Sequence, residues 1–222
     1  RTRLHPAVQT RPMPSTASLV IGFEADDHAV VWKPAGWVTS GPQHPSLREA
    51  LPGGLTPFEG TGALPRPEPV HRLDRATAGW VLIAKTATVA ANLSQQVEPG
   101  GGALKTYFAV CQGVTPSSAQ ILVPLDGKTA HTGLIRVAGG SLQGHAASGV
   151  RLSLHTGRTH QIRRHLAGLG HPIVGDTVYG GGTGSLLLVC TDLAYLDPTT
   201  GERRTVHAPL PKRFRRIPWI HG

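Results

Sequence analysis

The distribution of apolar and polar residues along this chain predicts more strands than helices. Residues 104–111 alternate with a period of two, so Lys105 and Tyr107 share one face of a strand. Short apolar runs between turn residues indicate further strands. We expect these at residues 30–32, 80–84, 121–123, 133–137, 149–154 and 186–190, with a hairpin of residues 194–196 and 203–207 across the turn at 197–201.

Two segments have the pattern of a short helix. Residues 86–96 are followed by a proline and a run of glycines, which end a helix. Residues 160–169 carry an apolar stripe of Ile162, Leu166 and Leu169 and end among glycines. Because strands outnumber helices and do not alternate regularly with them, we expect an α+β fold with a mixed, mostly antiparallel sheet flanked by helices.

The chain of 222 residues is long enough for one or two domains. We expect a loose N-terminal arm at residues 1–25, rich in arginine and proline, and one domain at residues 26–222. Whether the arm is a targeting segment stays open. The glycines and prolines of residues 41–69 predict a long surface loop. Apolar runs are far shorter than the roughly 20 residues that span a bilayer, so we expect no membrane partner.

Charge and cysteine content suggest a partner and a compartment. Lysine and arginine number 22 against 13 acidic residues, a formal charge of +9, and the sequence pI is near 10.4. A polyanion such as nucleic acid is therefore a candidate partner, although excess charge also serves solubility. The two cysteines, Cys111 and Cys190, lie in apolar strand-like runs. They fit buried thiols in a reducing compartment, and we expect a cytoplasmic protein.

One candidate for chemistry is Asp74, which directly precedes an apolar strand. His71 and Arg72 precede it and Arg75 follows it, so the carboxylate lies among groups that favour its charged form. An aspartate that caps a turn or pairs with a neighbouring arginine would show the same pattern. This run alone therefore does not decide between a structural and a chemical role.

A second basic segment, residues 156–163, joins a glycine turn, Arg158 and the start of a predicted helix. Such a helix terminus suits a carboxylate or a phosphate, although a simple helix cap explains the same residues. The histidines His155, His160 and His165 are spaced by five, which does not place them on one helical face. We therefore expect no metal site.

Several motifs, in order along the chain, resemble the RluA-type family of RNA pseudouridine synthases. The clearest are His71-Arg72-Leu73-Asp74 and the Lys105-Thr106-Tyr107 run. The likeness covers residues 30–214, and departures occur at Ala78, at Val189-Cys190 and in the glycines of 181–184. Further matching segments are residues 33–36, 77–79, 84–85, 156–163, 170–176, 179–180, 198–201 and 208–211.

The resemblance implies the pseudouridine synthase catalytic fold over residues 26–222, with no counterpart of the separate N-terminal RNA-binding domain of many relatives. It implies isomerisation of uridine in ribosomal or transfer RNA, without metal or organic cofactor. Asp74 would be the nucleophile, would stabilise the anomeric centre, or would abstract a proton from the sugar. The resemblance makes Arg158 its ion-pair partner and Tyr107 the ring that stacks on the uracil, although Tyr107 could simply be a sheet tyrosine.

The target nucleotide must leave its helix to be reached, and Arg72 is our candidate for the side chain that fills the gap. We expect RNA contacts from His71, Lys33, Arg163 and Arg136, although any such cation can also be solvated surface. We expect a monomer. Two other functions stay open, a non-catalytic RNA-binding protein and an N-glycosidase that would release the base.

Overall fold

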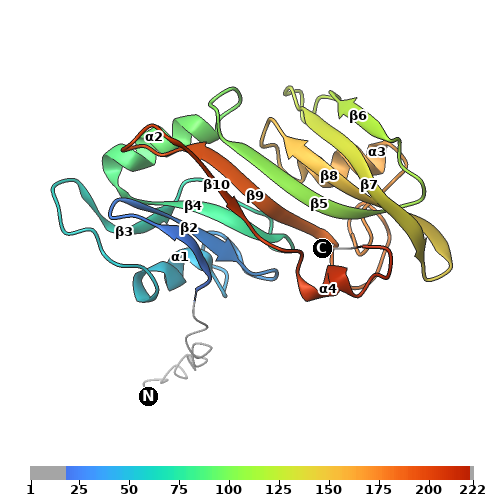
Figure 1. Ribbon diagram of the computed structural model, residues 1–222, viewed down its shortest axis with the longest axis horizontal. Coiled ribbons are helices and arrows are strands. Elements are labelled where there is room, and N and C mark those ends of the chain that lie inside the picture. Colours follow the sequence, from blue (N-terminus) through green and yellow to red (C-terminus); the bar gives the residue numbers. More distant parts are fainter. Residues whose placement is uncertain (1–18, 221–222) are drawn as a thin grey trace, which may run out of the picture.

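The computed structural model describes residues 19–220, which build one ten-stranded sheet with short helices on its faces (Figure 1). The strands are β1 (Ile21–Glu24), β2 (His28–Lys33), β3 (Ala63–Pro69), β4 (Ala78–Thr86), β5 (Leu104–Gln112), β6 (Ser118–Ile121), β7 (Thr132–Leu142), β8 (His145–Leu154), β9 (Leu188–Leu196) and β10 (Arg203–His207). The helices are α1 (Leu47–Ala50), a 3-10 turn (Leu51–Gly53), α2 (Ala87–Val97), α3 (Gln161–Gly168) and α4 (Lys212–Arg215).

The strand order is β1-β2-β4-β9-β5-β8-β7-β6, with β3 paired to β4 and β10 paired to β9. The β4–β9 contact is parallel and the other strand pairs are antiparallel. Figure 1 shows β9 between β4 on one side and β5 on the other. The expected α+β class with a mostly antiparallel sheet is confirmed.

The strand predictions need two corrections. Residues 188–190 and 194–196 belong to one strand, β9, and not to two, and residues 186–187 precede this strand. Polar residues interrupt its apolar pattern, but Thr191 bonds to the side chain of Asp192, which bonds to His207 of β10. The strand expected at residues 121–123 ends at residue 121, and Leu122 and Val123 lie exposed beyond it.

The long loop and the N-terminal arm were also predicted too broadly. Residues 41–69 contain α1, the 3-10 turn and β3, and Leu47 and Leu51 anchor them by complete burial. The prolines of β3 fit an outer strand with irregular pairing to β4. Residues 21–24 of the expected arm form β1, which pairs with β2. Residues 1–18 lie outside the described part.

Packing on the sheet fixes the elements that carry the candidate site. Helix α3 buries Ile162 and Leu166 in the larger apolar cluster, while α2 packs against β4 with Val89 and Leu93. The backbones of β4 and β9 approach closely at Gly79, whose φ is +147°. In residues 19–220, no helix has the length and apolar character that a membrane crossing needs.

Candidate active site

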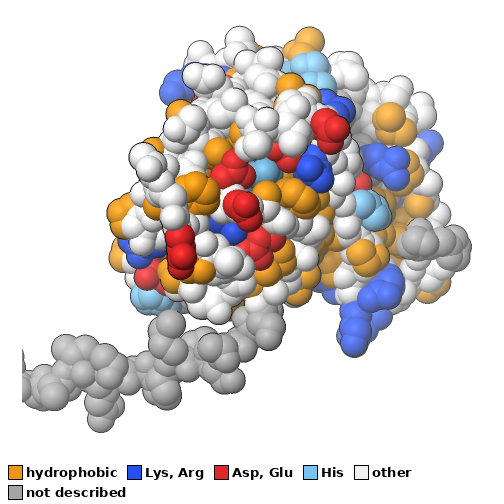
Figure 2. Space-filling model, turned by 60° about the vertical axis from the view of Figure 1, so that its left-hand side comes forward, with side chains coloured by type: hydrophobic (Ala, Val, Ile, Leu, Met, Phe, Trp, Pro, Cys, Tyr) orange, Lys and Arg blue, Asp and Glu red, His pale blue; other side chains and the backbone are white. Residues whose placement is uncertain are grey.

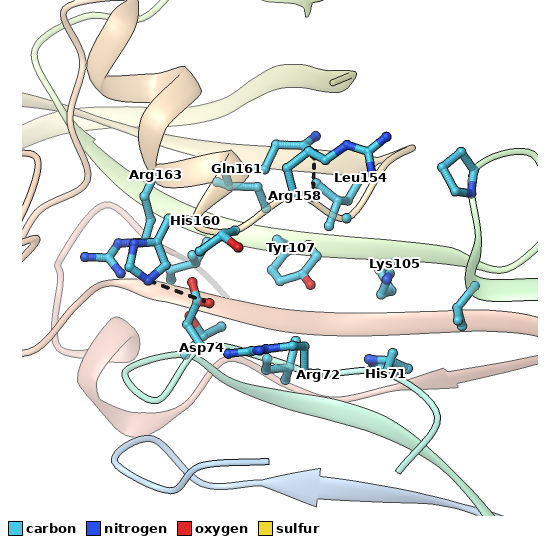
Figure 3. Close-up of a pocket in the computed structure, with 18 of the residues that line it drawn as sticks. His71, Arg72, Asp74, Lys105, Tyr107, Leu154, Arg158, His160, Gln161 and Arg163 are labelled. Carbon is cyan, nitrogen blue, oxygen red and sulfur yellow. Dashed lines mark hydrogen bonds and ion pairs between the residues drawn. The ribbon is translucent and has the colours of Figure 1, made fainter. Parts of the chain in front are cut away.

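A cavity of about 310 Å³ opens over β5, between the loop before β4 and the start of α3. Its lining includes Arg72, Asp74, Tyr107, Arg158 and His160 (Figure 3). A second cavity of about 560 Å³ lies against the same loop and shares Arg72, Asp74 and His160 with the first. The structure therefore brings all three predicted catalytic residues, Asp74, Tyr107 and Arg158, to one cavity.

Backbone and side-chain hydrogen bonds fix the loop that presents Asp74. The Thr77 N–H donates to the Asp74 carbonyl at 3.0 Å, which closes a turn directly after the aspartate. The Thr39 hydroxyl donates to the Leu73 carbonyl and accepts from the Leu73 N–H, both at 3.1 Å. The Gly36 N–H donates to the Arg75 carbonyl at 2.7 Å. The carboxylate is thus held on a rigid support.

Within residues 19–220, His160 is the basic side chain that comes nearest to the Asp74 carboxylate, and sequence reasoning did not place it in the site. Its Nε2 lies 3.9 Å from Asp74 Oδ1, and the two side chains are 29% and 23% exposed. His160 has a φ of 53°, the left-handed conformation, and its Nδ1 lies 3.1 Å from the Tyr179 hydroxyl. A non-glycine residue in this conformation is uncommon and often marks a functional position. No signal in the sequence predicts this backbone conformation.

Arg158 is not the ion-pair partner of Asp74 in this structure, which corrects our expectation. Its Nε donates to the Thr129 carbonyl at 2.9 Å. Its backbone N–H donates to Gln161 Oε1 at 3.0 Å, which ties the turn before α3 to the first residue of the helix. The guanidinium is directed along the β6–β7 connection and lines the cavity opposite Asp74.

Arg163 is also placed differently from our expectation. Its Nε and Nη2 donate to Asp176 Oδ2 and Oδ1 at 2.7 and 2.8 Å, and the two side chains are 7% and 0% exposed. These bonds raise the pKa of Arg163, and the charge of Asp74 adds to the rise. A buried, bidentate guanidinium of this kind does not reach an RNA phosphate, but its positive charge acts on Asp74.

The other expected RNA contacts divide into buried and open positions. Lys33 is fully buried and donates to the Trp37 carbonyl at 2.7 Å, so it is not a phosphate contact. Burial lowers its pKa to about 8, against the charge of Asp74. His71 accepts from the Leu82 N–H through Nε2 at 3.1 Å, and burial with the charge of Lys105 lowers its pKa to about 3. The ring is thus neutral.

Arg72 and Arg136 remain as expected RNA contacts. Arg72 is exposed and lines both cavities, whereas Arg136 lies in β7 and lines neither. Figure 2 shows several acidic side chains grouped on one face of the molecule, with lysine and arginine more frequent towards its right-hand edge. The excess positive charge is therefore unevenly distributed on that face.

Tyr107 forms the floor of the cavity from the middle of β5. It is 5% exposed, and its pKa is well above the ordinary value because of burial, with Cys190 and Asp74 adding to the rise. Its hydroxyl therefore keeps its proton near neutral pH. A buried ring beside an open cavity offers a flat apolar surface to a planar base.

Comparison with known sequences decides the family. Residues 27–168 match the family described as RNA pseudouridylate synthase. The chain belongs to this family. The match includes Asp74, Tyr107, Arg158 and His160, so both sides of the cavity lie within it. The synthase is an isomerase that converts uridine in RNA to pseudouridine, and the resemblance to the RluA type is confirmed.

Relatives and solved structures agree with this assignment. An uncharacterized RNA pseudouridine synthase of Synechocystis is 32% identical, over 90% of this chain and 68% of its own. The ribosomal large subunit pseudouridine synthase D of Vibrio cholerae is 31% identical, over 87% of this chain and 68% of its own. The structure of human RNA Pseudouridylate Synthase Domain Containing 4 superposes with a TM-score of 0.72 at 22% identity, over 90% of this chain and 94% of that one, and shows the same fold.

Proposed function

We propose that this synthase isomerises uridines of ribosomal RNA with Asp74 as its nucleophile. The observation that carries the assignment is the fixed Asp74 carboxylate at the edge of a cavity whose floor is Tyr107. Several relatives named as ribosomal large subunit synthases support ribosomal RNA as the substrate. Transfer RNA is the second candidate, because the resemblance to the RluA type implies either of these RNAs.

The reaction breaks the bond between the anomeric carbon and N1 of uracil, and forms a bond from the same carbon to C5. Asp74 attacks or stabilises the anomeric carbon, and the base keeps the electron pair of the broken bond. Tyr107 holds the base by stacking while it turns. The proton lost from C5 balances the proton gained at N1. The charge of Asp74 interacts with the Arg163 guanidinium, and His160 Nε2 lies 3.9 Å from Asp74 Oδ1.

The nucleotide reaches the cavity only when it leaves its stack. Arg72 is exposed and lines both cavities, which supports it as the side chain that fills the space left by the nucleotide. Arg158, which does not bind Asp74, is free to contact a phosphate beside the flipped nucleotide. Arg136 would contact RNA outside the cavities. We propose action in the cytoplasm as a monomer, in line with two free, buried cysteines.

The test compares Asp74→Asn with Asp126→Asn, a control at an exposed aspartate that pairs with Arg164. Ribosomal RNA from cells that lack the gene is incubated with each protein. Pseudouridine is then mapped by carbodiimide reactivity, and free uracil and RNA binding are measured. We expect Asp74→Asn to abolish pseudouridine while RNA binding persists, and the control to match the wild type.

Other results would identify a different function. Abasic sites and free uracil would indicate an N-glycosidase, and binding without modification by the wild type would indicate a non-catalytic RNA-binding protein. Substantial turnover by purified Asp74→Asn would refute the nucleophile. Turnover of transfer RNA alone would refute only the ribosomal substrate.

A further inference from the structure

Three lysines are buried in residues 19–220, and they differ in what their ammonium groups contact. Lys33 donates to the Trp37 carbonyl at 2.7 Å. Lys85 donates to Glu24 at 2.7 Å and to the Ala25 carbonyl at 2.8 Å. Lys105 is 8% exposed and, within the described residues, makes neither a hydrogen bond nor an ion pair. Its ammonium lines the active-site cavity.

A largely buried ammonium loses part of its hydration, and this cost stays uncompensated unless an anion or an acceptor comes close to it. Burial lowers the pKa of Lys105, and the charges at Cys190 and Glu98 oppose this only in part. Glu98 also lines the cavity but forms no ion pair with it. Lys105 Nζ is not one of the fully buried side-chain atoms without a partner, so the ammonium opens onto the cavity and can present its N–H donors to an acceptor there.

The position of Lys105 relative to the reacting bond defines what it can contact. Lys105 and Tyr107 lie on the same face of β5, and the rise of about 3.3 Å per residue separates their Cα atoms by roughly 7 Å. Figure 3 shows Asp74, Tyr107 and Lys105 in succession along the cavity. A uracil with its anomeric carbon at Asp74 and its ring on Tyr107 therefore directs its far edge, which carries a carbonyl oxygen, towards Lys105.

We propose that the Lys105 ammonium binds a carbonyl oxygen of the target uracil and stabilises the uracil anion that forms when the glycosidic bond breaks. This inference rests on the proposed mechanism at Asp74. The electron pair of the bond between the anomeric carbon and N1 passes to the base, where it spreads over N1 and both carbonyl oxygens. A fixed positive donor in a dry cavity stabilises this developing charge more than it stabilises the neutral base, so it accelerates bond cleavage.

The same contact selects the base. Uracil presents an oxygen at C4, which accepts from the ammonium. Cytosine presents an amine at this position, which can only donate, so a cytidine in the cavity would leave the ammonium unpaired and repel it.

The test uses the full chain and compares Lys105→Met with Lys85→Met, which removes a buried lysine far from the cavity. Single-turnover rates, KM and melting temperature are measured with ribosomal RNA from cells that lack the gene. We expect Lys105→Met to lose about 100-fold or more in kcat, as when an oxyanion donor is removed, with KM nearly unchanged. Its melting temperature should be unchanged or higher, whereas Lys85→Met should melt lower and keep its kcat.

A second substrate separates stabilisation of the anion from mere positioning. Fluorine at C5 stabilises the base anion but leaves no C5 proton to be lost, so the readout on RNA containing 5-fluorouridine is the single-turnover rate of cleavage of the bond between the anomeric carbon and N1. Lys105→Met should lose less of this cleavage rate than it loses on the unmodified RNA. Lys105→Gln, which keeps a donor without the charge, should fall between Lys105→Met and the wild type.

Three outcomes would contradict the proposed role of Lys105. A kcat equal to the wild type, an equal or larger loss on the fluorinated RNA, or failure of both Lys105 variants to fold would overturn the inference. In each of these three cases the proposed mechanism at Asp74 still stands if the wild type is active and Asp74→Asn is inactive. If the wild type makes no pseudouridine, or if Asp74→Asn makes it, the proposed mechanism has failed instead.

Discussion

The bidentate pair of Arg163 and Asp176 provides a direct test of how the α3 side of the active site is held. Arg163→Met keeps the length and apolar stem of the side chain but removes its charge. Asp176 then stays fully buried, with acceptors filled only by the N–H groups of Val178 and Tyr179 at 3.0 Å. A carboxylate that loses its buried partner destabilises the fold by about 3 to 5 kcal/mol. For a chain of this size, the melting temperature should fall by on the order of 10 °C.

The pH dependence follows from the direction of one pKa shift. In the wild type, Asp176 has a lowered pKa because the bonds to Arg163 and to the two N–H groups outweigh burial. Its stabilising effect is therefore present above the ordinary pKa of an aspartate and is lost as pH falls through the lower value. Without Arg163 the pKa rises, so the carboxylate accepts a proton earlier. The stability difference between wild type and variant should thus be largest near pH 7 and shrink towards about pH 4.

Urea unfolding followed by circular dichroism measures this difference at each pH. The control is Arg164→Met in the same helix, whose pair with Asp126 is exposed to solvent and should contribute little to stability. Adding Asp176→Asn to Arg163→Met removes the buried charge but keeps an acceptor, so it should recover part of the loss. A loss no larger than that of Arg164→Met, or no recovery in the double variant, would refute the reasoning.

Two further predictions concern the backbone and a buried lysine. Gly79→Ala should lower the free energy of unfolding in urea by about 3 kcal/mol, because its Cβ would lie within van der Waals distance of the Cys190 Cβ and 2.6 Å from the Cys190 carbonyl oxygen. The control is Gly53→Ala, whose Cβ would enter open space. An equal loss of stability in both variants would contradict the close approach at Gly79. For Lys33, the stability of the wild type relative to Lys33→Met should rise by roughly 3 kcal/mol between pH 8 and 10.5. In this range the folded state, with a pKa of about 8, has lost the Lys33 proton, whereas the unfolded state still holds it. A constant difference in stability across this range would exclude a lowered pKa.

The sequence predicts elements well where one physical pattern dominates. The alternation of residues 104–111 matches β5, and the apolar stripe after His160 matches α3. It fails where tertiary contacts override the local pattern. Polar residues in the middle of β9 suggested a break, but neighbouring strands satisfy their hydrogen bonds. Prolines in β3 suggested a loop, but an outer strand tolerates them.

The cavity shows the same division between motif and geometry. The family resemblance located Asp74, Tyr107 and Arg158, and all three line the cavity. It did not predict which basic side chain lies near Asp74, because that depends on the direction of each side chain at the start of α3. Arg158 turns towards Thr129 and Arg163 pairs with Asp176, while His160 approaches Asp74 from a left-handed backbone. The spacing of residues along the sequence gives little information about the direction in which each side chain points.

The place of β9 in the sheet has a consequence for how the protein is made. Asp74 belongs to the half built from β1 to β4, and Tyr107 with α3 belongs to the half built from β5 to β8. β9 joins the two, yet it follows both in the chain. During synthesis the halves would wait for this late strand, since pairing of distant segments is slow and domains fold from the N-terminus onwards. When only the first 187 residues have left the ribosome, the nascent chain thus contains both parts of the catalytic centre but not β9, the strand that joins them.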